Sequence, residues 1–158
     1  MGDFEIEGWD EFVKAFAGLV DKWDEKKKVL LGRIGAIMEA EILPLIPVDT
    51  SRLAGSFSIE VGGDYVAYGT DVEYALYVND GHVQHRRFLP VSAMSANGGK
   101  NYTKYLSKNN QKGIMLKEGY VAGKHYIERG MDKAMPRIET LIVSFMEQLY
   151  AEVEGGKL

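Results

Sequence analysis

Cysteine is absent from this chain of 158 residues, and histidine occurs only three times. The absence of cysteine excludes disulfides, a thiolate nucleophile and a zinc site built on cysteine. It is typical of proteins that are made and assembled in a reducing cytoplasm. No apolar run approaches the roughly 18 residues of a membrane-spanning helix, and residues 1–10 lack the basic and apolar regions of a signal peptide. We therefore expect no membrane contact and no targeting segment.

Sequence motifs for catalysis and nucleotide binding are also missing. The chain has no Gly-x-Ser-x-Gly, no phosphate-binding Gly-x-x-x-x-Gly-Lys-Ser/Thr and no Gly-x-Gly-x-x-Gly. His82 and His85, with Asp80 or Glu128, are a possible metal-ligand set, but a three-residue spacing aligns two ligands on a helix and not in the loop expected here. A metal-dependent hydrolase built on His82, His85 and His125 is the least favoured alternative. The sequence predicts no catalytic residues, no metal site and no cofactor.

The net charge of −4 conceals two halves of opposite sign. Residues 1–80 carry 7 Lys and Arg against 16 Asp and Glu, whereas residues 81–158 carry 12 against 7. A chain polarised in this way favours head-to-tail association of copies, unless the two halves mingle in the fold and cancel. The length fits one domain.

Two long helices are indicated by apolar residues at steps of three and four. The first spans about 8–43 and ends before Pro44 and Pro47, because proline cannot continue a helix. The second runs from about Gly123 or His125 to Glu152, with a kink or a late start at Pro136. We expect most of the first apolar stripe in the core, with Phe4, Ile6 and Trp9 reaching a neighbouring subunit. That stripe comprises Trp9, Phe12, Val13, Phe16, Leu19, Val20 and Trp23.

Between the helices the apolar period changes to two, which is typical of strands. Strands are predicted over about 57–61, 65–70 and 73–78, as an antiparallel meander, and a fourth over about 114–122. The fold class is therefore α+β: a small antiparallel sheet of three to four strands packed against a long N-terminal helix and a C-terminal helix, with a long flexible loop. The predicted parts of this single domain, 1–158, are an N-terminal arm (1–7), a helix (8–43), a β-meander (56–81), a flexible loop (92–113), a strand and the C-terminal helix (114–152) and a frayed tail (153–158).

Three motifs follow one another in the order of a known family. Residues 46–57 read IPVDTSRLAGSF, residues 74–82 read YALYVNDGH, and residues 123–134 read GKHYIERGMDKA. Over roughly residues 30–150, the chain resembles the tail-completion proteins of long-tailed phages, also described as head–tail joining, minor tail or neck components. It departs from that family at Ser51, where the family has glycine, and in a longer segment from Val83 to Leu116.

The motif residues are expected to define the fold rather than a binding site. Pro47 stops the first helix, and Asp49, Thr50 or Ser51 can cap the following turn. Leu53 is expected to anchor that turn in the core and to leave Arg52 exposed. Tyr74 and Tyr77 should lie on opposite faces of their strand, one in the core and one facing a neighbour. The structural motif residues are Pro47, Val48, Asp49, Thr50, Leu53, Ser56, Tyr74, Ala75, Tyr77 and Gly81.

A basic segment is the main candidate for contact with a partner. No Asp or Glu occurs between Gly81 and Lys117. Lysine and tyrosine can contact phosphates and bases without reading sequence, so the segment could meet passing DNA. Contact with an acidic protein surface is favoured over DNA, and a solvated loop with no partner remains open. The candidate residues are Arg86, Arg87, Lys100, Tyr102, Lys104, Tyr105, Lys108, Lys112 and Lys117.

The resemblance implies a virion structural protein of a tailed phage or prophage and not an enzyme. It implies a homo-oligomeric ring, a hexamer in the virion, at the head–tail interface, assembled in the host cytoplasm. The implied partners are other neck and tail proteins, namely the head-closure or stopper protein and the tail terminator. The alternative function is a sequence-independent DNA-binding protein that uses the basic segment 86–117.

Overall fold

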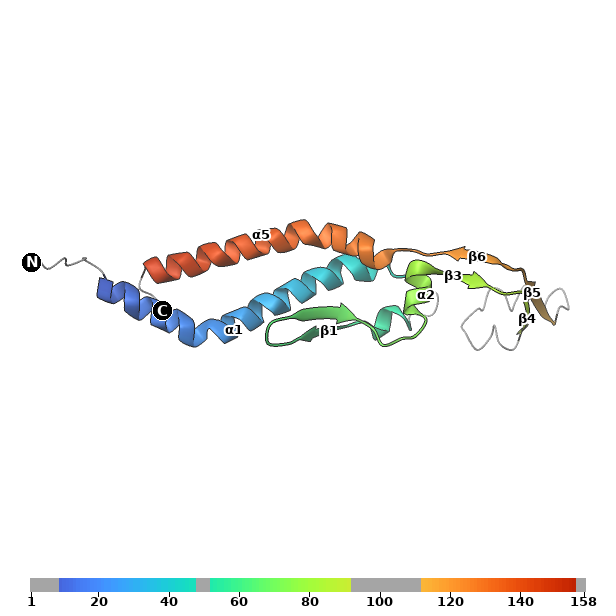
Figure 1. Ribbon diagram of the computed structural model, residues 1–158, viewed down its shortest axis with the longest axis horizontal. Helices are drawn as coiled ribbons and strands as arrows, with labels where there is room; N and C mark the ends of the chain where they lie inside the picture. The colour runs from blue at the N-terminus through green and yellow to red at the C-terminus, as the bar shows by residue number, and fades with distance from the viewer. Residues whose placement is uncertain (1–8, 48–51, 92–111, 156–158) are drawn as a thin grey trace, which may run out of the picture. The chain divides into compact units, whose positions relative to one another are not determined.

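The computed structural model describes residues 9–47, 52–91 and 112–155 (Figure 1). The chain divides into two compact units. Unit 1 comprises Met1–Glu41, Ile59–Tyr68 and Met131–Leu158, and unit 2 comprises Ile42–Ser58 and Gly69–Gly130. Each unit is described by itself. None of the helices in the described ranges is long and apolar enough to cross a membrane.

Two antiparallel helices form the frame of unit 1 (Figure 1). They are α1, Trp9–Ile42, and α5, Tyr126–Glu154, whose first turn belongs to unit 2. Lys26 pairs with Glu152 at 2.6 Å, and Glu41 pairs with Arg137. Because 15 residues separate the two pairs on either helix, both pairs fit one antiparallel register. α5 ends beside the first half of α1 (Figure 1), where Ala15 is only 4% exposed.

A β-hairpin packs against the middle of α1. Its strands are β1, Ser58–Val61, and β2, Val66–Gly69, and the amide of Gly62 donates to the Tyr65 carbonyl across the turn at 2.9 Å. A Cβ at Gly35 would lie 2.5 Å from Ile59 Cγ2 and 3.0 Å from Val66 Cγ2, so only glycine allows this approach. The close packing of the hairpin on α1 therefore requires glycine at position 35.

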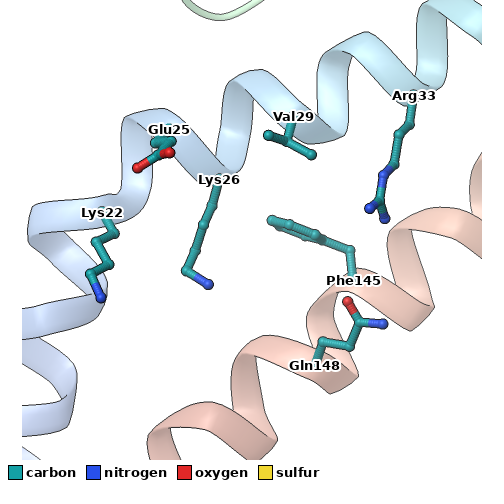
Figure 2. A pocket seen from close by; sticks show the side chains of 7 residues that line it. All are labelled: Lys22, Glu25, Lys26, Val29, Arg33, Phe145 and Gln148. Atoms are coloured by element: carbon teal, nitrogen blue, oxygen red, sulfur yellow. The ribbon is translucent and has the colours of Figure 1, made fainter. Parts of the chain in front are cut away.

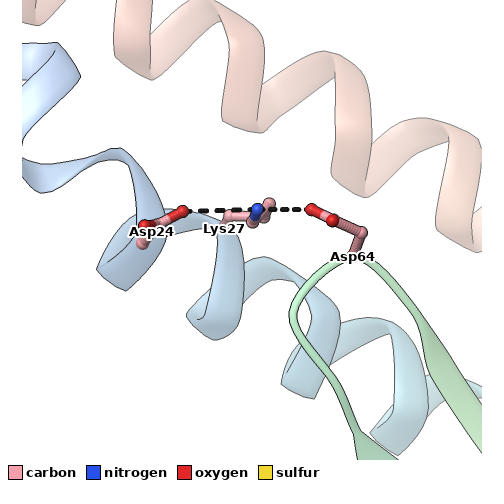
Figure 3. Close-up of polar contacts among 3 residues, drawn as sticks. All are labelled: Asp24, Lys27 and Asp64. Atoms are coloured by element: carbon pink, nitrogen blue, oxygen red, sulfur yellow. Dashed lines mark hydrogen bonds and ion pairs between the residues drawn. The ribbon is translucent and has the colours of Figure 1, made fainter.

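A lysine on α1 fastens the turn of this hairpin. Figure 3 shows Lys27 between Asp64, in the turn, and Asp24, one turn earlier on α1 at 3.3 Å. The hydrogen bond with Asp64 raises the pKa of Lys27 above its ordinary value, so the ammonium stays charged at neutral pH. Both carboxylates are exposed, and such pairs contribute little stability individually; we assign Lys27 a positioning role.

Unit 2 contains two separate antiparallel ladders (Figure 1). In the first, β3, Gly81–Gln84, pairs with β6, Gly119–Ala122, so that Gly81 lies opposite Ala122. In the second, β4, Arg87–Pro90, pairs with β5, Gly113–Leu116, so that Arg87 lies opposite Leu116. A short helix, α2, Ala75–Asp80, leads directly into β3.

Tyr126, the first residue of α5, is the centre of the small core of unit 2. Its side chain is fully buried, packs edge-on against Phe57 at 6.1 Å and donates its hydroxyl to the Ala75 carbonyl at 3.2 Å. Burial, with the nearby carboxylates of Asp80 and Glu128, raises the pKa of this phenol. Around it the chain runs through two 3₁₀ turns, η1 (Leu43–Leu45) and η2 (Ala54–Ser56), near the buried side chains of Ile42, Ile46, Leu53 and Ala75.

The α+β class and both long helices are confirmed. α1 ends at Ile42, just before Pro44, as expected from the two prolines. A late start of the second helix is wrong, because α5 begins at Tyr126 and contains Pro136 within it.

The sheet prediction is wrong in two details. Residues 73–78 do not form a third strand of the meander, because Ala75–Asp80 is the helix α2. The described strands also form three two-stranded ladders instead of one sheet of three to four strands. The strands β3 and β4 were not expected, because their short apolar stretches alternate weakly and find partners only about 30 residues away.

The expectation that Tyr74 and Tyr77 lie on opposite faces of a strand is wrong, because Tyr74 precedes α2 and Tyr77 lies within it. Leu53 is buried and Arg52 is exposed, as expected for an anchored turn. Ser56 Oγ donates to the Leu53 carbonyl at 2.7 Å and shares a hydrogen bond with Thr70 at 2.6 Å. The capping residues Val48, Asp49, Thr50 and Ser51, the arm 1–7 and most of the loop 92–113 lie outside the described residues.

Two helical glycines give a test of the packing in unit 2. A Cβ at Gly130 on α5 would lie 2.5 Å from Ile42 Cγ1 and 2.8 Å from Ile42 Cα, whereas a Cβ at Gly32 on α1 meets nothing within 4 Å. We expect Gly130→Ala to destabilise the protein by about 1–3 kcal/mol through overpacking. Gly32→Ala, the control, should stabilise it by about 0.5–1 kcal/mol because alanine favours helix. Urea unfolding followed by circular dichroism measures both; stabilisation by Gly130→Ala would contradict the contact.

Candidate interaction surfaces

The basic segment is exposed on the β4–β5 ladder of unit 2. Four of its candidate residues are described, and all four are exposed. Arg86 and Arg87 lie at the end of the ladder where Lys117 follows Leu116. Lys112 lies at the other end, where its carbonyl accepts from the Val91 amide at 3.0 Å. The remaining candidates, Lys100, Tyr102, Lys104, Tyr105 and Lys108, lie outside the described residues.

These four cations come from two strands that are about 25 residues apart in sequence. The ladder places Arg87 directly opposite Leu116, and Gln84 Nε2 donates to the Lys117 carbonyl at 2.8 Å. The four cations therefore lie on one two-stranded ladder and its flanks, although two of them are distant in sequence from the other two. Glu118, directly after Lys117, is the nearest carboxylate in sequence, and none of the four cations forms an ion pair within the described residues.

A buried amide connects α2 to the start of α5. The side chain of Asn79 is only 2% exposed. Its Nδ2 donates to Asp80 Oδ1 at 2.6 Å and to both oxygens of Glu128 at 3.0 and 3.1 Å, and its Oδ1 accepts from the Ile127 amide at 3.1 Å. Its backbone carbonyl accepts from the amide of His125 at 2.9 Å. One residue thus bonds three groups at the start of α5 and the carboxylate of its own neighbour, Asp80.

Two glycines allow the backbones to meet at this junction. Gly81 has φ +86°, a conformation that side chains rarely tolerate, and its Cβ would lie 2.5 Å from the Val121 carbonyl oxygen. A Cβ at Gly123 would collide with the backbones of Asn79 and Asp80. The family-motif residue Gly81 is therefore required by backbone geometry, and Gly123 by close approach.

The same junction holds the one group of possible metal ligands among the described residues. Single ligand atoms of Asp80, His125 and Glu128 lie within 4.8 Å of one another. All three side chains are exposed, and both carboxylates already accept from Asn79. His82 and His85 are not part of this group. We regard the arrangement as the capped start of a helix, since a carboxylate in the first turn is favoured there without an ion.

A hollow of about 300 Å³ lies between α1 and α5 in unit 1 (Figure 2). Figure 2 shows Lys22, Lys26 and Arg33 extending from α1, with Phe145 on α5 between them. Sequence reasoning missed this hollow, although the run Lys26-Lys27-Lys28 marked the basic stretch of α1. The lining residues are Lys22, Glu25, Lys26, Val29, Arg33, Phe145 and Gln148.

The expectation that most of the first apolar stripe is core is wrong. Phe12 and Phe16, which stack at 6.2 Å, are 46% and 53% exposed, and Trp23 is 40% exposed. Ala15, in the same part of α1, is only 4% exposed, so this stretch is covered in part and not throughout. α5 also leaves apolar side chains exposed on its second half. The exposed residues in these two stretches are Phe12, Val13, Phe16, Val20 and Trp23 on α1 and Ile142, Val143, Met146 and Tyr150 on α5.

Comparison with known proteins finds a family of phage tail components that resembles part of the chain. The profile of a family described as "Bacteriophage HK97-gp10, putative tail-component" matches residues 10–81, which include α1, the β1–β2 hairpin and α2. This match confirms the resemblance to tailed-phage tail proteins that the motifs indicated.

A protein of Bacillus subtilis (strain 168) with the printed name "Uncharacterized protein YqbI" is 31% identical to this chain. The aligned region covers 54% of this chain, and the chain spans 64% of the length of that relative. No solved structure matches the chain significantly.

Asn79 provides the test of the junction. We expect Asn79→Ala to lower the free energy of unfolding by about 2–3 kcal/mol, because it removes the buried amide that bonds the Asp80 and Glu128 carboxylates and the Ile127 amide. Gln84→Ala is the matched control: it removes a side-chain amide with one exposed hydrogen bond and should cost less than about 0.5 kcal/mol. Thermal and urea unfolding of both variants give the comparison. Equal losses would mean that Asn79 does not organise the junction.

Proposed function

We propose that this chain, whose residues 10–81 resemble a phage tail component, forms a ring at the head-proximal end of a phage tail and allows filled heads to join finished tails. The observation that carries the proposal is the family match together with the order of the three motifs. The chain would be a virion protein at the head–tail interface, assembled in the host cytoplasm. Its partners would be a head-closure or stopper protein on one side and the tail terminator on the other.

The exposed surfaces of the chain suit assembly into a ring. The nine apolar residues named above on α1 and α5 are each at least 40% exposed, and exposed apolar patches on a protein mark interaction sites. Burial of such side chains between copies would provide affinity, and charged groups around them would set the register. A six-fold ring is what the family resemblance implies. We propose that the chain acts through these contacts and not as an enzyme.

Electron microscopy of a phage with a stop codon in this gene tests the proposal. We expect full heads beside separate tails of normal length, because the joining surface would be missing. Supplying the intact chain from a plasmid should restore joined, infectious particles, which controls for effects on neighbouring genes. Intact infectious particles without the chain would contradict the neck role.

DNA binding by the β4–β5 ladder is the second candidate function. The observation that favours it is the set of exposed cations Arg86, Arg87, Lys112 and Lys117, none of which forms an ion pair within the described residues. In a ring through which DNA passes, they would contact phosphates without reading sequence.

Fluorescence anisotropy with a labelled duplex at increasing salt tests this second function. If the ladder binds DNA, affinity should fall steeply with salt, and Arg86→Glu/Arg87→Glu should reduce the slope of log K against log salt by about 2. Lys133→Glu, an exposed cation on α5 in unit 1, is the control and should change the slope little. Absence of binding at low salt would eliminate DNA as the partner of the ladder.

A further inference from the structure

The hollow between α1 and α5 has the properties of a receptor for an acidic, aromatic segment. Its apolar surface comes from Val29, which is 51% exposed, and Phe145. Three cations surround that surface against one carboxylate, Glu25. A hollow that combines an apolar surface with a positively charged rim has the chemistry of a binding site.

Two of the three cations have no ion pair within the described residues. Lys26 is held by Glu152 at 2.6 Å, which closes one end of the hollow. No described carboxylate lies within salt-bridge distance of Lys22 or Arg33. Further along α5 from Ile138 to Glu154 there are carboxylates but no Lys or Arg. The rim of the hollow therefore carries two cations, Lys22 and Arg33, without an ion pair among the described residues.

The first 13 residues of the chain have the complementary chemistry. They contain five acids and no Lys or Arg, and the first basic residue is Lys14. Phe4, Trp9 and Phe12 interleave with these acids. Phe12 and Val13, at the start of α1, are each nearly half exposed. An acidic segment with aromatic side chains matches both the charge of the rim and the apolar surface within it.

The reach of the chain decides whose segment can fill the hollow. Between Trp9 and Val29, α1 rises about 30 Å. The five residues from Phe4 to Trp9 span at most about 18 Å even when fully extended. Phe4 therefore cannot reach Val29 of its own copy, and Arg33 lies further still. Only the segment of another copy can occupy the hollow in full.

We propose that residues 1–13 of one copy dock into the α1–α5 hollow of a second copy, with acids on Lys22 and Arg33 and Phe4 against Val29 and Phe145. Donor and acceptor are different surfaces, so the contact is heterologous and can repeat around a closed ring. The proposal rests on the proposed ring in one respect, since it names the contact between neighbouring subunits. It also gives the acidic N-terminal part of the chain a basic partner within the same protein.

Charge reversal in the full-length chain tests the contact. We expect Lys22→Glu/Arg33→Glu to weaken self-association about tenfold or more in sedimentation velocity at low salt. Asp3→Lys/Glu5→Lys should weaken it similarly, and combining both pairs in one chain should restore it. Lys14→Glu/Lys28→Glu is the matched control, because it makes the same charge change at exposed positions of α1 that do not line the hollow. Equal loss in the control, or no restoration by the combined variant, would overturn the proposal.

Isotope mixing distinguishes docking between copies from docking within one. A zero-length carbodiimide cross-linker joins carboxylates to lysines, and a mixture of ¹⁴N- and ¹⁵N-labelled chains reports the origin of each cross-linked peptide. We expect mixed-isotope cross-links from Asp3 or Glu5 to Lys22 or Lys26. Cross-links of a single isotope only, or none at about 1 mM chain, where even contacts with millimolar Kd are populated, would refute the contact.

The two proposals fail separately. Mixed-isotope cross-links together with infectious particles that lack the chain would refute the neck role and keep the contact between copies. Separate heads and tails without such cross-links would keep the neck role and refute this contact.

Discussion

The buried amide of Asn79 is the interaction on which the organisation of unit 2 depends. It binds both carboxylates beside it and the backbone amide of Ile127, so α2 and the first turn of α5 cannot separate without exposing several polar groups. The backbones approach one another closely at Gly81 and Gly123, and the fully buried side chain of Tyr126 packs at the same junction. The β3–β6 ladder leaves directly from this junction, because β3 begins at Gly81 and β6 ends at Ala122, and the β4–β5 ladder that carries the basic residues lies between these two strands in the chain.

Unit 1 is organised by a different constraint, the fixed register of two helices of unequal extent. The Lys26–Glu152 and Glu41–Arg137 pairs align α1 and α5, and in this alignment Ala15 is buried while Phe12 and Phe16 stay about half exposed. The hollow with a positive rim lies between the same two helices. Exposed aromatic side chains and an open hollow suit a subunit that buries these surfaces against neighbouring subunits.

Strong, long-range periodicity made the helices predictable, whereas the short segments were not. Both helices follow from apolar steps of three and four and from the prolines near Pro44. Residues 73–78 have an alternation that favours a strand, but contacts of Asn79 and Ala75 with the start of α5 select a helix there. Those contacts join residues about 50 positions apart, so no local pattern contains them. Likewise the sequence identified the cations of the basic segment, while the pairing of β4 with β5 brought Arg87 and Lys117 to one end of a ladder.

The sequence by itself determined the α+β class, the long helices, the phage-tail motifs and the opposite net charges of the two halves of the chain. Each of these features depends only on local composition or on the spacing of residues. Only the tertiary structure decided which apolar residues are buried, where the basic residues gather and which glycines are required. The physical reason is that burial and close approach depend on what lies opposite a residue. The first stripe of α1 is amphipathic in sequence, yet Phe12 and Phe16 are about half exposed while Ala15 between them is buried.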